Sequence, residues 1–296
     1  MVALLGTLPR PAARAIGAGI GALAYRLLGR LRTAGRTNLA RAYLQLAADE
    51  REAILRGVYR SLGWQLAEFC LMSSTTRQQA DQFIRYEGLE NYLAARDRGK
   101  GVLVLTGHLG AWELSSFYHS LVGHPMSLVI RRLDNPLVDA FVNRIRCLHG
   151  NRVIHKDDFA RGLLTAMHHG DTVGILMDTN MTPPQGVFVP FFGTPACTAT
   201  ALARVALKTD AAVLPGFLVW QQSERNGRGG YVLHFGEPLT LIRSTNPQAD
   251  PQADIVANTA LFAAVTEQYI RRYPDQWLWL HRRWKTRPEG EPKFYG

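Results

Sequence analysis

The stretch GKGVLVLTGHLG, residues 99–110, decides the fold class of this chain. Its apolar centre, Val102 to Thr106, is short and bounded by glycine on both sides, which is typical of a strand buried on both faces. A helix is expected directly after it, from about Ala111 to Val122. A buried strand that leads straight into a helix is the repeating unit of an α/β sheet.

The same alternation continues along the rest of the chain. Further strands are expected at 127–130, 151–155, 171–178 and 212–220, with helices at 136–148, 160–168, 198–209 and 258–272 and a hairpin return at 225–238. Upstream, apolar residues at three and four spacing predict helices at 37–43 and 49–71, so the first third is expected to be helical throughout. The sequence therefore predicts an α/β fold with one mixed, mostly parallel sheet flanked by helices.

Composition limits the classes of protein to consider. A hydrophobic content of 47% over 296 residues is ample for a packed core. Lys and Arg number 34 against 24 Asp and Glu, and the net charge of +10 predicts attraction to nucleic acid, acidic lipid head groups or an acidic protein. The three cysteines, Cys70, Cys147 and Cys197, lie far apart without CxxC spacing, which argues against a disulfide framework and a structural zinc site.

Residues 1–36 form a segment of different character. An uncharged run of 11 residues, 15–25, is shorter than the roughly 20 residues that a membrane span needs. It is followed by Arg26, Arg30, Arg32 and Arg36. This pattern favours a helix that lies in or dips into an anionic leaflet, and an alanine-rich core helix is the alternative. We therefore expect a membrane-associated helix over 1–36 and the α/β domain over 37–296, with spanning or flat orientation left open.

His108 and Glu113 are the first candidates for chemistry. His108 follows a strand, and α/β folds bind ligands at the carboxyl ends of their strands. Five positions on a regular helix are about 140° apart, so the two side chains meet only if His108 lies in the turn before the helix. Glu113 would then accept from Nδ1–H while Nε2 takes a proton from a substrate. The alternative is that His108 bonds a backbone carbonyl and Glu113 complements the helix dipole.

No serine or cysteine stands in a nucleophile-elbow sequence such as GxSxG, so direct transfer is favoured over a covalent enzyme intermediate. The stretch GHLGAWE, residues 107–113, resembles the HX4D/E motif of glycerolipid and lipid A acyltransferases. With three further stretches, the chain resembles the lipid A late-acyltransferase family (HtrB/LpxL/LpxM-like) from its N-terminal helix to residue 288. These stretches are GILMDTNMTPPQGVFVPFFGTPACT (174–198), VLPGF (213–217) and YPDQWLWLHRRWKTRP (273–288).

The resemblance implies roles for five residues of this chain. His108 matches the general base of the family, and Glu113 matches the carboxylate that pairs with it. Arg146 matches an arginine that lines the active-site cleft, and Asp178 matches an acidic residue of the site. Arg131 follows the second strand, where a cation would meet a substrate phosphate. The alternatives are a solvated surface residue for Arg131 and a loop or helix cap for Asp178.

The resemblance also implies a reaction and its partners. It implies an O-acyltransferase that moves a fatty acyl group from an acyl carrier protein thioester to a hydroxyl of a lipid A precursor, at the cytoplasmic face of a bacterial inner membrane. It implies no cofactor and no metal, and an acidic carrier protein suits the positive charge of this chain. Another glycolipid acceptor, such as a phosphatidylinositol mannoside, or a non-catalytic membrane lipid-binding protein are the alternatives.

Two aromatic stretches have two interpretations each. VFVPFFGTPACT, residues 187–198, is expected to form a rigid apolar wall that holds an acyl chain, or to pack in the core. QWLWLHRRWK, residues 276–285, combines three tryptophans with basic residues, as at a membrane interface or in a core. A nucleic-acid stacking patch is not favoured, because no recognisable nucleic-acid motif accompanies it. The sequence gives neither the acyl chain length nor the hydroxyl that is acylated.

Overall fold

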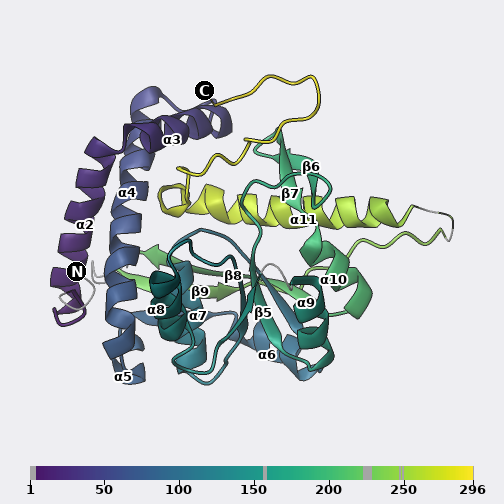
Figure 1. The fold of residues 1–296 in the computed structure, drawn as a ribbon, viewed down its shortest axis with the longest axis horizontal. Helices are drawn as coiled ribbons and strands as arrows, with labels where there is room; N and C mark the ends of the chain where they lie inside the picture. The colour runs from purple at the N-terminus through teal and green to yellow at the C-terminus, as the bar shows by residue number, and fades with distance from the viewer. Residues whose placement is uncertain (1–4, 156–158, 223–228, 247, 249, 296) are drawn as a thin grey trace.

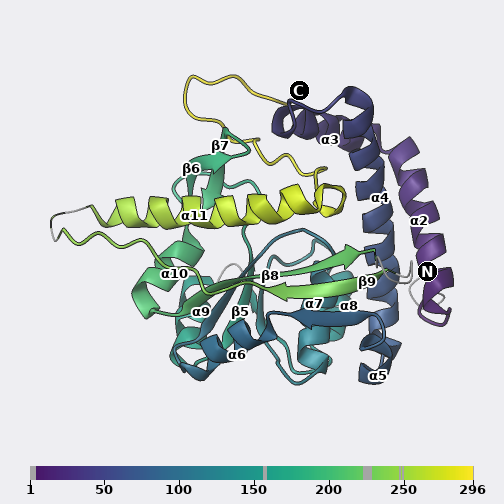
Figure 2. The same cartoon turned by 180° about the vertical axis from the view of Figure 1, so that it is seen from behind.

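A seven-stranded sheet with the order β1-β9-β8-β2-β5-β3-β4 forms the centre of the molecule (Figure 1). The computed structural model describes residues 5–155, 159–222, 229–246, 248 and 250–295. The strands are β1 (Ile84–Glu87), β2 (Val102–Thr106), β3 (Ser127–Ile130), β4 (Arg152–His155), β5 (Thr172–Leu176), β8 (Ala212–Gln221) and β9 (Gly230–Phe235). Among the described strands of this sheet, only the β8–β9 pair is antiparallel (Figure 2), so the expected mixed, mostly parallel sheet is confirmed.

Helices cover both faces of this sheet. The helices of the described residues, including α2 and α3, which pack against α4, are α2 (Arg10–Leu27), α3 (Gly29–Ala42), α4 (Ala48–Leu71), α5 (Arg77–Ala80), α6 (Leu89–Asp97), α7 (Trp112–Leu121), α8 (Pro136–Arg146), α9 (Phe159–His168), α10 (Ala201–Thr209) and α11 (Pro251–Arg272). Short 3-10 turns lie at Met72–Ser74 (η1) and Pro274–Gln276 (η3). Val104 of β2 belongs to the same buried cluster as Phe117 of α7, whereas Leu105 belongs to the cluster of Phe262 of α11. Alternate residues of β2 therefore pack into two buried clusters, one on each face of the sheet, as expected for a buried parallel strand.

Two expectations about secondary structure were wrong. The first third is not entirely helical, because the four-residue strand β1 pairs with β9 at the sheet edge. The expected helix at 198–209 begins at Ala201, since Thr194–Ala199 forms β7, which pairs with β6 (Gly186–Phe191) in an antiparallel hairpin. β1 has only four residues, and β6 and β7 each contain a proline, so these strands carry too little periodicity to be recognised from sequence. The antiparallel pair β8–β9 forms as expected, and residues 223–228, which connect its strands in the sequence, lie outside the described residues.

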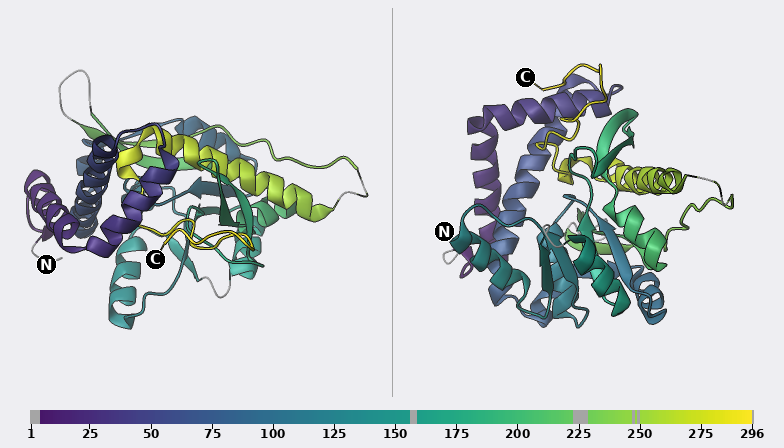
Figure 3. Two further views of the ribbon diagram at one scale, coloured as in Figure 1. Left: turned by 90° about the horizontal axis from the view of Figure 1, so that it is seen from above. Right: turned by 45° about the vertical axis from the view of Figure 1, so that its right-hand side comes forward.

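The N-terminal helix α2 packs along α4, and α3 crosses the ends of both (Figure 3, right). Glycines allow the close contact: a Cβ on Gly17 would lie 2.2 Å from the carbonyl oxygen of Gly63, and one on Gly21 would lie 2.1 Å from that of Tyr59. Arg14, also on this face, is buried between the rings of Trp64 and Trp220. One side of the N-terminal helix is therefore part of the protein interior.

The described part of the chain contains no helix that is long and apolar enough to cross a membrane. The expected boundary after residue 36 falls inside α3, which continues to Ala42 without a break.

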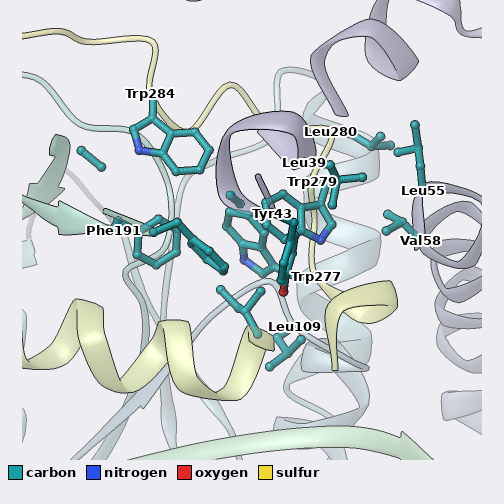
Figure 4. Close-up of a cluster of buried hydrophobic side chains, with 14 of the residues drawn as sticks. Leu39, Tyr43, Leu55, Val58, Leu109, Phe191, Trp277, Trp279, Leu280 and Trp284 are labelled. Atoms are coloured by element: carbon teal, nitrogen blue, oxygen red, sulfur yellow. The ribbon is translucent and has the colours of Figure 1, made fainter. Parts of the chain in front are cut away.

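The C-terminal tryptophans lie in an aromatic core (Figure 4). Trp277, Trp279 and Trp284 are at most 1% exposed, and their cluster includes Phe191 and Phe192 of the β6–β7 hairpin. Of the two interpretations of each aromatic stretch, core packing is therefore the one that the structure bears out.

Candidate active site

The loop that carries His108 is held by the C-terminal segment. The backbone N–H of Leu278 donates to the carbonyl of His108 at 3.0 Å, and the N–H of Gly110 donates to the carbonyl of Gln276 at 3.0 Å. Gly110 has a φ of +63°, and a Cβ there would lie 1.9 Å from the carbonyl oxygen of Leu218. Only glycine fits this turn, which fixes His108 at the carboxyl end of β2.

Asp178, just after β5, is the carboxylate that bonds the imidazole of His108. It accepts from His108 Nδ1 at 2.9 Å, from the backbone N–H of His108 at 2.7 Å and from Trp277 Nε1 at 2.7 Å. Gly107 makes room for this approach, because a Cβ there would lie 2.9 Å from Asp178 Cγ. The Asp178 side chain is 2% exposed, so all three hydrogen bonds are shielded from water.

The two groups shift each other's proton affinity. Burial lowers the pKa of His108, but the charge and hydrogen bond of Asp178, with a further contribution from Glu113, raise it overall above 6.5. Burial alone would raise the pKa of Asp178, yet the charge and hydrogen bonds of His108 and the Trp277 N–H hold it well below its ordinary value. His108 is thus a stronger base than a free histidine, and its partner stays ionised.

Glu113 does not bond His108 as expected from the HX4E spacing. Its carboxylate forms a two-pronged ion pair with Arg146: Arg146 Nε donates to Oε2 at 2.8 Å and Nη2 donates to Oε1. Glu113 lies in the first turn of α7, and this turn faces the end of α8. Burial lowers the pKa of Arg146, but the hydrogen bonds and charge of Glu113 raise it overall. The orienting carboxylate is therefore Asp178, and Glu113 anchors a cation.

A cavity of about 730 Å³ opens beside these groups. His108, Glu113 and Arg146 line it, whereas Asp178 lies behind His108 and does not. Arg131 lines the cavity too, but its side chain is 73% exposed and pairs with Asp134 at 2.8 Å. The structure thus gathers all five predicted residues around one cavity, with Arg131 at its exposed margin.

Several residues of this site were not identified from the sequence. Trp277 and Gln276 hold Asp178 and the His108 loop, and Arg204 of α10 adds a third arginine to the cavity lining. The sequence identifies Trp277 only as one of several tryptophans, because nothing in its spacing indicates a hydrogen bond to a residue 99 positions away.

The expected apolar wall is not part of the cavity. Val187 to Phe192 of the β6–β7 hairpin do not contribute to its lining, whose apolar residues include members of β2, β3, β5 and the start of α10.

Comparison with known proteins identifies the family of this chain. The sequence model of the family described as "Bacterial lipid A biosynthesis acyltransferase" matches residues 1–286. The chain is 28% identical over 288 residues to a lipid A biosynthesis palmitoleoyltransferase of Escherichia coli K12, covering 97% of this chain and 90% of the relative. It is 27% identical over 294 residues to the lipid A biosynthesis lauroyltransferase of the same strain (99% and 91%), and 30% identical over 297 residues to a lipid A biosynthesis acyltransferase of Haemophilus influenzae (97% and 89%). The chain therefore belongs to the bacterial lipid A biosynthesis acyltransferase family.

Proposed function

We propose that this protein transfers a fatty acyl group from an acyl carrier protein thioester to a hydroxyl of a lipid A precursor. The observation that carries the proposal is the pair of His108 and buried Asp178 beside a mainly apolar cavity with arginines in its lining. A base, an apolar site for a hydrocarbon chain and cations for phosphate are what this transfer requires.

In the proposed mechanism His108 acts as general base. Because Asp178 occupies Nδ1, Nε2 is the ring nitrogen that takes the proton of the acceptor hydroxyl. The hydroxyl oxygen attacks the thioester carbonyl, the tetrahedral intermediate collapses, and the C–S bond breaks. The imidazolium then returns its proton to the departing thiolate. Asp178 stabilises the imidazolium between these two steps.

Arg146 is proposed to stabilise the oxygen of the tetrahedral intermediate. Its side chain is 14% exposed, it lines the same cavity as His108, and Glu113 fixes the guanidinium plane through two hydrogen bonds. A fixed cation in a site shielded from water acts strongly on charge that develops on a reacting carbonyl. In this proposal Glu113 acts through Arg146 and contributes only a longer-range charge to His108.

The protein is proposed to work at the cytoplasmic face of a bacterial inner membrane, and two exposed apolar surfaces support this placement. The first surface lies where α2 meets α3 and consists of Leu23, Leu27, Leu28 and Leu31. Arg26 and Arg30 are exposed beside it. Leucines with interspersed arginines suit insertion into an anionic leaflet.

The second surface lies on α8 and the residues on either side of it, and α8 stands out from the layered body (Figure 3, left). It consists of Leu133, Leu137, Val138, Phe141 and Leu148. Arg132 and Arg144 are exposed beside it, and Leu133 also lines the active-site cavity. A bilayer in contact with α8 would lie at the edge of that cavity, from which a lipid acceptor and acyl chain could enter.

The experiment that tests the proposal is mass spectrometry of lipid A from cells with and without this protein, together with turnover of acyl carrier protein thioesters by the purified chain. We expect one acyl group fewer in lipid A from cells that lack the protein, and loss of turnover in His108→Ala with an unchanged circular dichroism spectrum. If lipid A is unchanged and another glycolipid is acylated, that glycolipid is the acceptor and the proposed lipid A acceptor is wrong. If the wild-type protein binds lipid but shows no turnover, the proposal that it is an enzyme is refuted.

A further inference from the structure

The active-site cavity lies where two neighbouring strands separate. β3 and β5 pair only at Ser127 with Val173 and at Leu128 with Gly174. Beyond these pairs, Ile130 of β3 and Leu176 of β5 both line the cavity. The cavity therefore occupies the opening between two diverging strands, and the pair Leu128–Gly174 forms its floor.

Met126 completes this floor from the residue before β3. Its Cε lies 3.0 Å, and its Sδ 4.0 Å, from the place where a Cβ on Gly174 would be. The methyl group of Met126 thus borders the space that a side chain at 174 would fill. The backbone N–H of Met126 donates to the Oδ1 of buried Asn151 at 2.9 Å, which fixes the start of the side chain while its flexible end remains free to adapt.

The structure beyond Met126 is closed. Met126 is 7% exposed and belongs to the same buried cluster as Phe117 of α7 and Ile145 of α8. An acyl chain that extended from His108 to Met126 would pass Thr106 and then Val104. Val104 lies two residues, or about 7 Å, further along β2 than Thr106. Packed side chains of this buried cluster border the cavity at that point.

The other side of the cavity has a different character. Toward α10 the lining includes polar groups, which belong to Thr179, Gln185, Thr200 and Arg204. The lining residues around the floor that carry no polar side chain are Val104, Met126, Leu128 and Gly174. A hydrocarbon chain gains from the apolar end, and burying a polar sugar or phosphate there would be unfavourable.

We propose that Met126 and Gly174 form the stop that sets the longest acyl chain this enzyme transfers. This inference rests on the proposed function, because the stop acts on the acyl group that His108 delivers to the acceptor. The proposal predicts that substitutions at these two neighbouring residues change the preferred acyl chain length in opposite directions.

Two substitutions make this opposition measurable. Met126→Ala removes the side chain from the floor, and we expect the preferred chain to lengthen by about two carbons. Gly174→Ala places a methyl group 3.0 Å from Met126 Cε, so that the flexible methionine moves toward the cavity and the preferred chain shortens by about two carbons. The double variant, in which the alanine at 174 takes part of the freed space, is expected to return toward the wild-type preference.

The experiment offers the purified chain a mixture of saturated acyl carrier protein thioesters of graded length, with lipid A precursor from cells that lack this protein, and reads the products by mass spectrometry. Met126→Leu is the conservative control. Met167→Ala truncates another buried methionine, which does not line the cavity, and both controls should keep the wild-type product distribution.

Opposite shifts in the two variants, with unchanged controls, would support the stop. An unchanged distribution in both, or a shift in the same direction, would overturn it while leaving the proposed acyl transfer intact. A wild-type chain that acylates lipid A precursor from none of the thioesters would overturn the proposed function itself.

Discussion

Asp178 holds His108 through both carboxylate oxygens, because Oδ1 accepts from the ring Nδ1 and Oδ2 accepts from the backbone N–H. One carboxylate therefore fixes the tautomer of the imidazole and the loop that presents it. The bond from Trp277 Nε1 to Oδ2 links this pair to the aromatic core, so that the position of the base depends on the C-terminal segment.

We predict that Asp178→Asn lowers kcat/KM by at least about 100-fold and moves the acidic limb of its pH profile to lower pH. His108 works as a base only when it is neutral, so activity falls as pH drops through its pKa, which Asp178 raises above 6.5. Removing the charge of Asp178 lowers that pKa and extends the neutral form to more acidic pH. Identical acidic limbs in variant and wild type would contradict this assignment.

Glu113→Gln is predicted to act differently. It removes the charge that pairs with Arg146 but breaks no hydrogen bond to His108, so the rate falls while the acidic limb moves less than in Asp178→Asn. In urea, the free energy of unfolding should fall by about 1–3 kcal/mol. We expect a value near the lower end of this range, because Glu113 is 25% exposed. A double-mutant cycle with Arg146→Met checks the coupling, and additive losses would refute the pair.

The sequence predicted the parallel core of the fold well, because its signals are local. The expected bounds of β2 and β3 agree with the structure, since each is a short apolar run between turn residues. β1 was missed because it has four residues at the sheet edge, and Arg85 and Glu87 within it resemble a surface turn. The family and the candidate site residues were identified by resemblance over the whole chain. Such a resemblance carries information that hydrophobic periodicity does not.

The partner of His108 could not be predicted correctly, because it depends on strand register. β2 and β5 are parallel neighbours, with Thr106 opposite Leu176. Two residues further along each strand, His108 and Asp178 therefore lie level with each other. The spacing between His108 and Glu113 is visible in the sequence, whereas the pairing of strands 70 residues apart is not.

The contact between α2 and α4 gives a matched pair of stability predictions. Gly17→Ala places a Cβ 2.2 Å from a backbone oxygen of α4 and should destabilise the protein by about 1–3 kcal/mol. Gly19→Ala, on the same helix, has no atom within 4 Å of its Cβ and should stabilise it by about 0.5–1 kcal/mol through helix propensity. Both are measured by urea unfolding. Equal effects of the two substitutions would mean that α2 does not pack against α4 in solution.

The exposed side chains of α8 give the last prediction. Leu137 is 81% exposed and Phe141 40% exposed, so charging either one costs little folding stability but prevents its insertion into a bilayer. We expect Leu137→Asp and Phe141→Asp each to weaken binding to anionic vesicles by about 10- to 100-fold, because an inserted side chain of this size contributes about 1.5–3 kcal/mol. Ile242→Asp, at a position 47% exposed outside both apolar surfaces, is the control that should bind like the wild type. Vesicle flotation at two salt concentrations measures the effect, since salt weakens the attraction of the arginines but not the insertion of the apolar groups.

If the α8 variants and the Ile242 variant bind equally well, α8 does not contact the bilayer. The surface where α2 meets α3 would then be the one that contacts the membrane.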